Sequence, residues 1–132
     1  GDLYVQIEVE PHPFFERRGD DLVCEVPISF PQAALGATIE VPTLDGKARV
    51  KVPSGTQSGK TLRLRGKGLP LVRGRGAGDQ LVKLQIETPQ NLTAKQRELL
   101  EAFEDTLEAD EGATAAAPRR KGFLEKLKEL FD

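Results

Sequence analysis

The residues with the most obvious chemical potential lie in the stretch PSGTQSGKT, residues 53–61, which looks like a phosphate-binding loop. Such a loop needs the pattern G-x-x-x-x-G-K-[ST] between a strand and a helix. Here only three residues separate Gly55 from Gly59. The flanking segments KARVKV and TLRLR alternate between apolar and polar residues, which predicts strands on both sides. We therefore interpret GTQSG as a hairpin connection and expect no nucleotide site.

Single reactive residues offer little for catalysis or metal binding. His12 is the only histidine, and neither a nucleophile nor a carboxylate stands directly beside it. Cys24 is the only cysteine, and its position between inward Leu22 and Val26 predicts a small core residue rather than a reactive thiol. No spacing typical of metal ligands occurs in the sequence. We expect neither enzymatic activity nor a bound metal.

A run of basic residues keeps a nucleic-acid module open as an alternative. Between Gly46 and Gly78 there are nine basic residues and no acidic one. Several of them occupy outward positions of predicted strands, where solvated charges are expected. No aromatic residue between Phe30 and Phe103 could stack on bases. The formal net charge of −2 gives no general attraction to nucleic acid or to anionic lipid, and we expect to find neither as a partner.

The elements that would position these residues are mainly strands. Alternating patterns predict strands at 2–10, 21–30, 37–46, 47–52, 61–65 and 79–88. One short helical turn is predicted at PQAALG, ending at Gly36. Strands with one apolar face each must pair face to face or close on themselves. The expected fold is mainly β, a small β-sandwich, followed by two C-terminal amphipathic helices.

The two helices carry apolar stripes that need a partner surface. Thr93 and Gln96 have the spacing of a capping box at the start of the first helix. The stripes either cover their own domain or meet a second copy of the chain, and we predict a homodimer. The predicted dimerisation residues are Leu99, Leu100, Phe103, Leu107, Phe123, Leu127, Leu130 and Phe131. The predicted divisions are a β-sandwich domain at 11–89, a helix at 90–109, a flexible linker at 110–121 and a helix at 122–132, with dimerisation through 90–132.

The N-terminal segment looks like the end of an earlier repeat. GDLYVQIEVEPHP resembles GDQLVKLQIETPQ further along, so we interpret residues 1–10 as the last strand of a preceding, mostly absent β-domain. The sequence contains no methionine, which also indicates a fragment. No apolar run approaches the ~20 residues that span a bilayer. A single cysteine and no signal-peptide pattern fit a cytoplasmic location.

Several segments resemble one family. GDLYVQIEVEPHPFFERRGDDL, ALGATIEVPTLDG and GKTLRLRGKGLP resemble the C-terminal region of DnaJ-type co-chaperones, the bacterial heat-shock partners of DnaK. The pattern H-x-x-F-x-R-x-G falls on His12, Phe15, Arg17 and Gly19. The resemblance implies the second of two client-binding β-sandwich domains, followed by a dimerisation segment. Its partners would be unfolded client polypeptides and a second copy of itself.

The same resemblance implies what lies outside this chain. The family's ATPase-stimulating J-domain carries His-Pro-Asp in a helical hairpin, whereas the one His-Pro here, at His12, follows a predicted strand. The family's zinc module needs repeated cysteine pairs, and Cys24 stands alone. We therefore expect no cofactor in this chain. Zinc would belong to the absent cysteine-rich module, and contact with DnaK would use absent regions.

The family resemblance also implies a client site, a shallow apolar groove between the strands at 21–30 and 37–46. Pro27 and Pro42 interrupt these strands, and a proline inside a strand indicates an edge or a bulge. An open edge over apolar side chains suits strand addition. The predicted client-binding residues are Cys24, Val26, Ile28, Phe30, Ile39 and Val41. Two alternatives stay open, a sealed core at these positions and a purely structural dimerisation unit.

Overall fold

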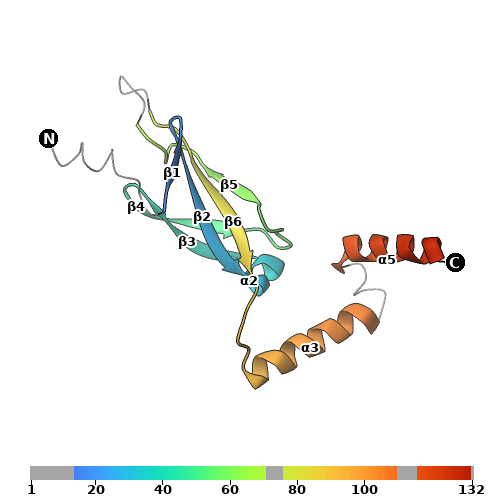
Figure 1. Ribbon diagram of the computed structural model, residues 1–132. Helices are drawn as coiled ribbons and strands as arrows, with labels where there is room; N and C mark the ends of the chain where they lie inside the picture. The colour runs from blue at the N-terminus through green and yellow to red at the C-terminus, as the bar shows by residue number, and fades with distance from the viewer. Residues whose placement is uncertain (1–13, 71–75, 110–115, 132) are drawn as a thin grey trace. The chain divides into compact units, whose positions relative to one another are not determined.

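The computed structural model describes residues 14–70, 76–109 and 116–131 (Figure 1). The chain forms two compact units, Gly1–Thr88 and Pro89–Asp132, and each is described by itself. The strand predicted at the N-terminus and His12 lie outside the described residues. Among the described residues, the first unit has two β-sheets and one short helix, and the second has two helices. The predicted class, mainly β with C-terminal helices, is confirmed.

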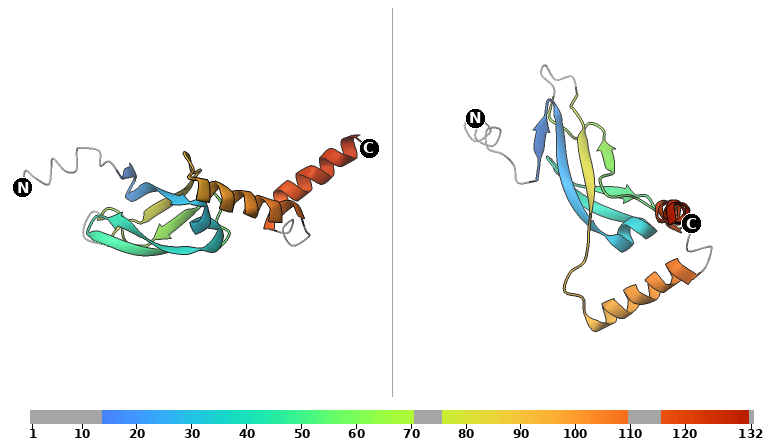
Figure 2. Two further views of the ribbon diagram at one scale, coloured as in Figure 1. Left: turned by 90° about the horizontal axis from the view of Figure 1, so that it is seen from below. Right: turned by 45° about the vertical axis from the view of Figure 1, so that its right-hand side comes forward.

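Four strands form the larger sheet, in the order β1-β2-β6-β5. Their bounds are Glu16–Arg18 for β1, Asp21–Ser29 for β2, Gln80–Glu87 for β6 and Thr61–Leu64 for β5. The two central strands, β2 and β6, run parallel although about fifty residues separate them in sequence, and Leu22 lies opposite Gln80. The outer strands β1 and β5 pair antiparallel with them. Figure 2 shows this sheet from two further sides.

The smaller sheet consists of β3, Ala37–Thr43, and β4, Gly46–Val52, paired antiparallel. A two-residue turn joins them, because Thr43 lies opposite Gly46 in the register. The Thr43 hydroxyl donates a hydrogen bond to the Asp45 carboxylate at 2.8 Å. This bond, and then the nearby Lys67 ammonium, lower the pKa of Asp45. The turn is thereby held in place by charge and by a hydrogen bond.

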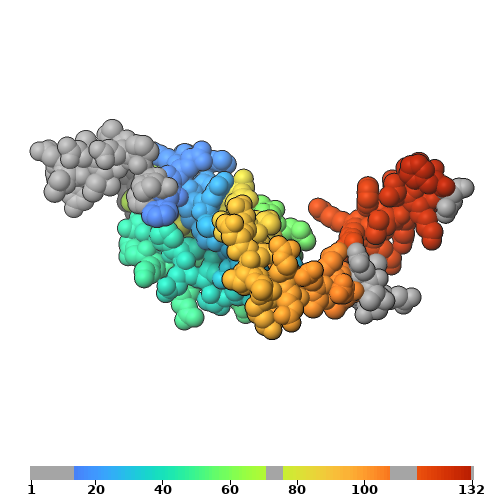
Figure 3. All heavy atoms as spheres, turned by 60° about the horizontal axis from the view of Figure 1, so that its bottom comes forward, coloured from blue at the N-terminus to red at the C-terminus, as the bar shows by residue number. Residues whose placement is uncertain are grey.

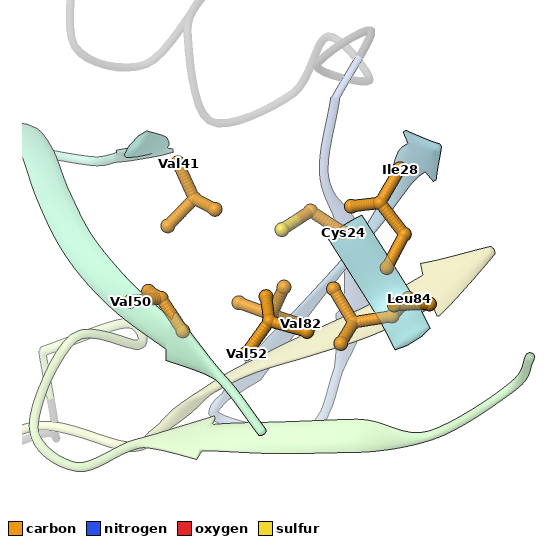
Figure 4. Packing of buried hydrophobic residues seen from close by; sticks show 8 residues of the cluster. Cys24, Ile28, Val41, Val50, Val52, Val82 and Leu84 are labelled. Carbon is orange, nitrogen blue, oxygen red and sulfur yellow. The ribbon is translucent and has the colours of Figure 1, made fainter. Parts of the chain in front are cut away.

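The apolar core lies between the two sheets (Figure 4). In the close-up, side chains from β2 and β6 point toward side chains from β3 and β4. Its buried members are Cys24, Ile28, Ala33, Val41, Val50, Val52, Val82 and Leu84. The alternation that predicted the strands also predicted which side chains would be buried, because residues two apart share a face. The result is a small β-sandwich.

A single short helix, α2, spans Phe30–Leu35 and follows β2 directly. Ser29 and Gln32 form a capping box, with bonds of 3.1 and 2.9 Å between each side chain and the other residue's backbone N–H. Gly36, at φ 85°, ends the helix, as the sequence predicted. The prediction that Phe30 is the last residue of the strand was wrong. The capped Ser29 starts the helix one residue earlier.

The segment between β4 and β5 is a connection between sheets, so the predicted GTQSG hairpin was wrong. β4 pairs with β3, whereas β5 pairs with β6. Alternation predicts where strands lie but does not reveal their partners. The backbone N–H groups of Gly55 and Thr56 donate to the Ala33 carbonyl at 2.9 and 3.0 Å, and that of Gly59 donates to Leu84 at 2.7 Å. These N–H groups are therefore already used inside the protein.

The second unit contains α3, Ala94–Ala109, and α5, Pro118–Phe131. The predicted capping box is present, because the Gln96 N–H donates to the Thr93 hydroxyl at 3.1 Å and the Thr93 N–H donates to the Gln96 side chain at 2.8 Å. The last helix begins at Pro118, inside the stretch that we interpreted as linker. Proline suits a first helical turn, since the N–H that it lacks has no partner there.

Candidate functional site

One side of β2 is open along most of the strand. β1 pairs with β2 only as far as Val23, and no described strand lies on that side beyond it. On the opposite side, the Leu22 N–H donates to the Asp79 carbonyl at 2.9 Å. Successive residues of a strand direct their backbone groups to opposite sides. From Leu22 onward, the backbone N–H and C=O groups of every second residue therefore point toward β6. Those of the residues in between point toward the open side.

On the open side of β2, no strand among residues 14–70, 76–109 and 116–131 pairs with Glu25 or Pro27. Glu25 directs both its N–H and its C=O outward, and Pro27 directs a C=O outward without an N–H to leave unpaired. The edge ends at Ser29, whose N–H donates to the Gln32 side chain. A further strand could therefore pair with β2 at these two residues, as the proline in the sequence indicated.

The six predicted client-binding residues divide into two groups. Cys24, Ile28 and Val41 are sealed in the core, with exposed fractions of 2%, 3% and 1%. Val26 and Ile39 are only partly buried and pack against that core from its rim. The sixth, Phe30, is also partly exposed, at the first turn of α2. The three half-exposed side chains are the ones that a bound segment could touch.

One residue of this region was missed by the sequence reasoning. Gln80 is fully buried, and its side-chain N–H group donates to the Pro42 carbonyl at 2.8 Å and to the Cys24 sulfur at 3.4 Å. It thus links the two sheets behind the open edge. Burial raises the pKa of the Cys24 thiol, and the bond from Gln80 partly offsets this. The available signal was a polar residue at an inward position of a strand.

Asp79 directly precedes β6 and holds the first residues of that strand next to the start of β2. Its carboxylate accepts the Gly66 N–H at 2.9 Å and an Arg63 hydrogen bond at 2.5 Å. These two partners lower the pKa of Asp79, the backbone bond from Gly66 contributing most. The Asp79 N–H donates to the Asp21 carboxylate at 2.7 Å. At Gly78 a side chain would collide with the Asp20 carbonyl, so glycine allows this close approach.

The apolar stripes of the two helices are largely exposed within the second unit. The exposed fractions are 57% for Leu99, 42% for Phe103, 63% for Phe123, 39% for Leu127, 75% for Leu130 and 82% for Phe131. Leu100 and Leu107 are partly exposed. An ion pair of 3.2 Å between Arg120 and Glu104 connects α5 to α3. Much of the apolar surface of both stripes is therefore exposed to solvent in the described part of this unit.

The described residues also bear on three other kinds of site, for a metal ion, a membrane and a phosphate group. No group of three His, Cys, Asp or Glu side chains in these residues could hold a metal ion. No described helix is long and apolar enough to cross a membrane. Lys60 and Thr61, at the end of the stretch that looks like a phosphate loop, lead directly into β5, a strand. This arrangement lacks the helix N-terminus on which phosphate loops depend.

These features are those of a small two-sheet β-sandwich followed by amphipathic helices, and the comparisons with known proteins place this arrangement in one family. Residues 1–89 match the family model described as the DnaJ C terminal domain. Residues 95–132 match the model described as the chaperone protein DnaJ C-terminal region. The chain therefore belongs to the DnaJ C-terminal domain family, as its sequence segments indicated.

A curated relative is similar over almost the whole chain. The "Chaperone protein DnaJ" of Ruminiclostridium cellulolyticum is 54% identical over 131 residues. The match covers 99% of this chain and 33% of that protein. The chain thus spans about a third of the length of this relative, and corresponds to a DnaJ-type chaperone's C-terminal domain.

Proposed function

We propose that this chain binds non-native polypeptide by adding an extended client segment to the open edge of β2. The carrying observation is that no described strand pairs with β2 at Glu25 and Pro27, beside the partly exposed Val26. A strand paired there gains main-chain hydrogen bonds whatever its sequence. Its inward side chains would lie against the rim formed by Val26 and Ile39. Such a site selects apolar segments without recognising one sequence.

This proposal refines the roles of the six predicted residues. Cys24, Ile28 and Val41 hold the sandwich together, and the half-exposed Val26, Phe30 and Ile39 contact the client. The activity is binding and release rather than a chemical reaction, so the chain is not an enzyme and needs no cofactor. In a longer DnaJ-type protein the domain would hold clients in the cytoplasm for DnaK, which would be contacted through other regions.

The experiment compares rim substitutions with an exposed control. Ile39→Ser and Val26→Ser should each weaken binding of a labelled, extended apolar peptide by about tenfold, equivalent to ~1.4 kcal/mol. Leu44→Ser removes a leucine that is 51% exposed, more than Val26 or Ile39, from the turn between β3 and β4 and should leave affinity unchanged. Amide spectra would verify that each variant stays folded. Equal affinity in all variants would place the client elsewhere.

The second part of the proposal is that the helices α3 and α5 form a homodimer. Their exposed apolar stripes support it, because exposed patches of this kind mark interaction surfaces. Changing Phe103 and Leu107 to Asp should convert the dimer to a monomer in sedimentation, while Arg97→Asp, on the same helix, should not. A monomer of the unmodified chain at high concentration would contradict the dimer. Peptide binding is a property of the other unit and should survive in the monomer.

A further inference from the structure

A second open edge lies along β4, in the smaller sheet. β4 pairs only with β3 among the described strands. Pro42 lies opposite Lys47 in the register, and proline has no N–H, so this pair cannot exchange hydrogen bonds. Antiparallel pairs alternate, so Arg49 and Lys51 occupy the same kind of position. The N–H and C=O groups of these three β4 residues therefore point away from β3.

The side chains at these three positions are all cations. Lys47, Arg49 and Lys51 are exposed, and none of them forms an ion pair with a carboxylate in the described part of the chain. Some other cations of this unit are paired. Arg63 pairs with Asp79, and Lys83 pairs with Glu25. Figure 3 shows side chains of β3 and β4, in cyan to green, projecting from the surface.

The inner face of the same edge is apolar. Ala48 is partly exposed, whereas Val50 and Val52 are buried in the core. A strand added beside β4 would place alternate side chains opposite the three cations, about 5 Å away, and the others against this apolar rim. We propose that β4 is a docking edge for an extended acidic peptide in which carboxylate and apolar residues alternate.

Two features favour an acidic peptide over other occupants. Charged edge residues keep a second copy of β4 from pairing, because the two sets of cations would repel each other. The same charges favour a strand of opposite sign. RNA would find the cations, but no aromatic residue lies between Phe30 and Phe103 to stack on bases. A peptide also uses the outward backbone groups, which RNA would not require.

The test uses the full chain and a synthetic peptide that alternates glutamate and valine. The triple variant Lys47→Glu, Arg49→Glu, Lys51→Glu should weaken binding at least about tenfold, since each pair is worth a few tenths to 1 kcal/mol. A matched variant with the same charge change, Lys60→Glu, Arg65→Glu, Arg97→Glu, should bind almost normally. Circular dichroism would verify folding of both. Equal loss in the two variants would mean general charge attraction and overturn the proposal.

Two further probes separate strand pairing from other ways of binding. Methylating the peptide nitrogens that face β4 should abolish binding, whereas methylating the alternate nitrogens should not. On binding, the amides of Lys47, Arg49 and Lys51 should become protected from hydrogen exchange. If methylation has no effect in either register, the backbone is not used. If a uridine RNA binds and the peptide does not, and if the triple variant weakens the RNA, then the edge is a nucleic-acid surface and the proposal is overturned.

Discussion

The edges of β2 and β4 have the same backbone chemistry but opposite surroundings. Each leaves alternate N–H and C=O groups without a strand partner in the described residues, and each is marked by a proline, Pro27 in β2 and Pro42 opposite β4. Beside β2 lie the partly exposed, apolar Val26 and the exposed anion Glu25, whereas the exposed side chains of the β4 strand at Lys47, Arg49 and Lys51 are cations. An open backbone edge gives the capacity to bind a strand. The neighbouring side chains then select which strand is bound.

The largest expected effect is a loss of stability, on substitution of a core residue next to the rim of the β2 edge. Val41 and Ile39 are both inward residues of β3, but only Val41 is sealed, at 1% exposed. Val41→Ser should lower the free energy of unfolding by about 3 kcal/mol, because it removes a buried side chain and buries a hydroxyl. Ile39→Ser should cost much less stability and chiefly affect peptide binding. Urea denaturation of both variants would measure this difference.

The control for this prediction is Thr38→Ser. Thr38 is similar in size to valine and lies next to Ile39, but it is exposed on the outer face of β3. Its substitution should leave the unfolding midpoint unchanged. If Ile39→Ser unfolds the domain as strongly as Val41→Ser, the rim belongs to the core. The contrast between a sealed floor and an accessible rim would then be wrong.

A smaller effect, on peptide affinity, is expected when a proline removes one outward backbone N–H group from either edge. Glu25→Pro removes the outward N–H from β2, and Arg49→Pro removes the corresponding N–H from β4. Loss of one hydrogen bond, about 1 kcal/mol, should weaken the apolar peptide about fivefold in the first variant only. The alternating acidic peptide should respond only to the second, which also loses a charge. Fluorescence titration of both peptides against both variants would test this reciprocity.

A common response of the two peptides would contradict separate edges. Proline is acceptable at these positions because their N–H groups do not belong to the existing ladders. Thermal unfolding of the two variants should therefore stay close to that of the unmodified chain. If both peptides lose affinity in Glu25→Pro and neither does in Arg49→Pro, then β2 alone binds strands.

Much of this comparison could be predicted from the sequence, because it depends on local pattern. Period-two alternation placed the inward residues of β2, β3, β4 and β6, and Pro27 indicated an edge in β2, whereas the edge of β4 was not predicted. The predicted cap Thr93 lies where α3 begins, whereas the cap at Ser29 was not predicted. These signals work because each arises from a few neighbouring residues.

The missed features depend on residues far apart in the chain. The parallel pairing of β2 with β6 leaves no signal in either strand, so the loop between β4 and β5 was taken for a hairpin. β1 was missed because Glu16–Arg18 is short and wholly polar. The division of the predicted site into sealed and half-exposed residues depends on packing between sheets. Alternation indicates an inward direction, but it does not say whether the interior is closed there.

Acid should lower the stability of the protein through Asp79, which holds the start of β2, whereas the open edge of β2 has no such carboxylate anchor among the described residues. The Gly66 N–H and Arg63 lower the pKa of Asp79 in the folded protein. Its contribution to stability is therefore present above the unfolded pKa of about 3.9 and is lost as the pH falls through the lower folded value. Asp79→Asn should flatten the pH dependence of the unfolding midpoint below about pH 4. Asp20→Asn, a nearby exposed carboxylate, serves as the control.

The smallest effect expected is that of salt on the β2 edge. Raising salt from about 0.1 to 1 M shortens the screening length from about 10 to about 3 Å. Affinity for an apolar peptide rests on backbone hydrogen bonds and on contacts with Val26 and Ile39, so it should change by less than about twofold. Affinity of the acidic peptide for β4 rests partly on exposed ion pairs and should fall several-fold. Isothermal titration at both salt concentrations would test this, and an equal fall for both peptides would mean that charge, rather than apolar contact, governs binding at β2 as well.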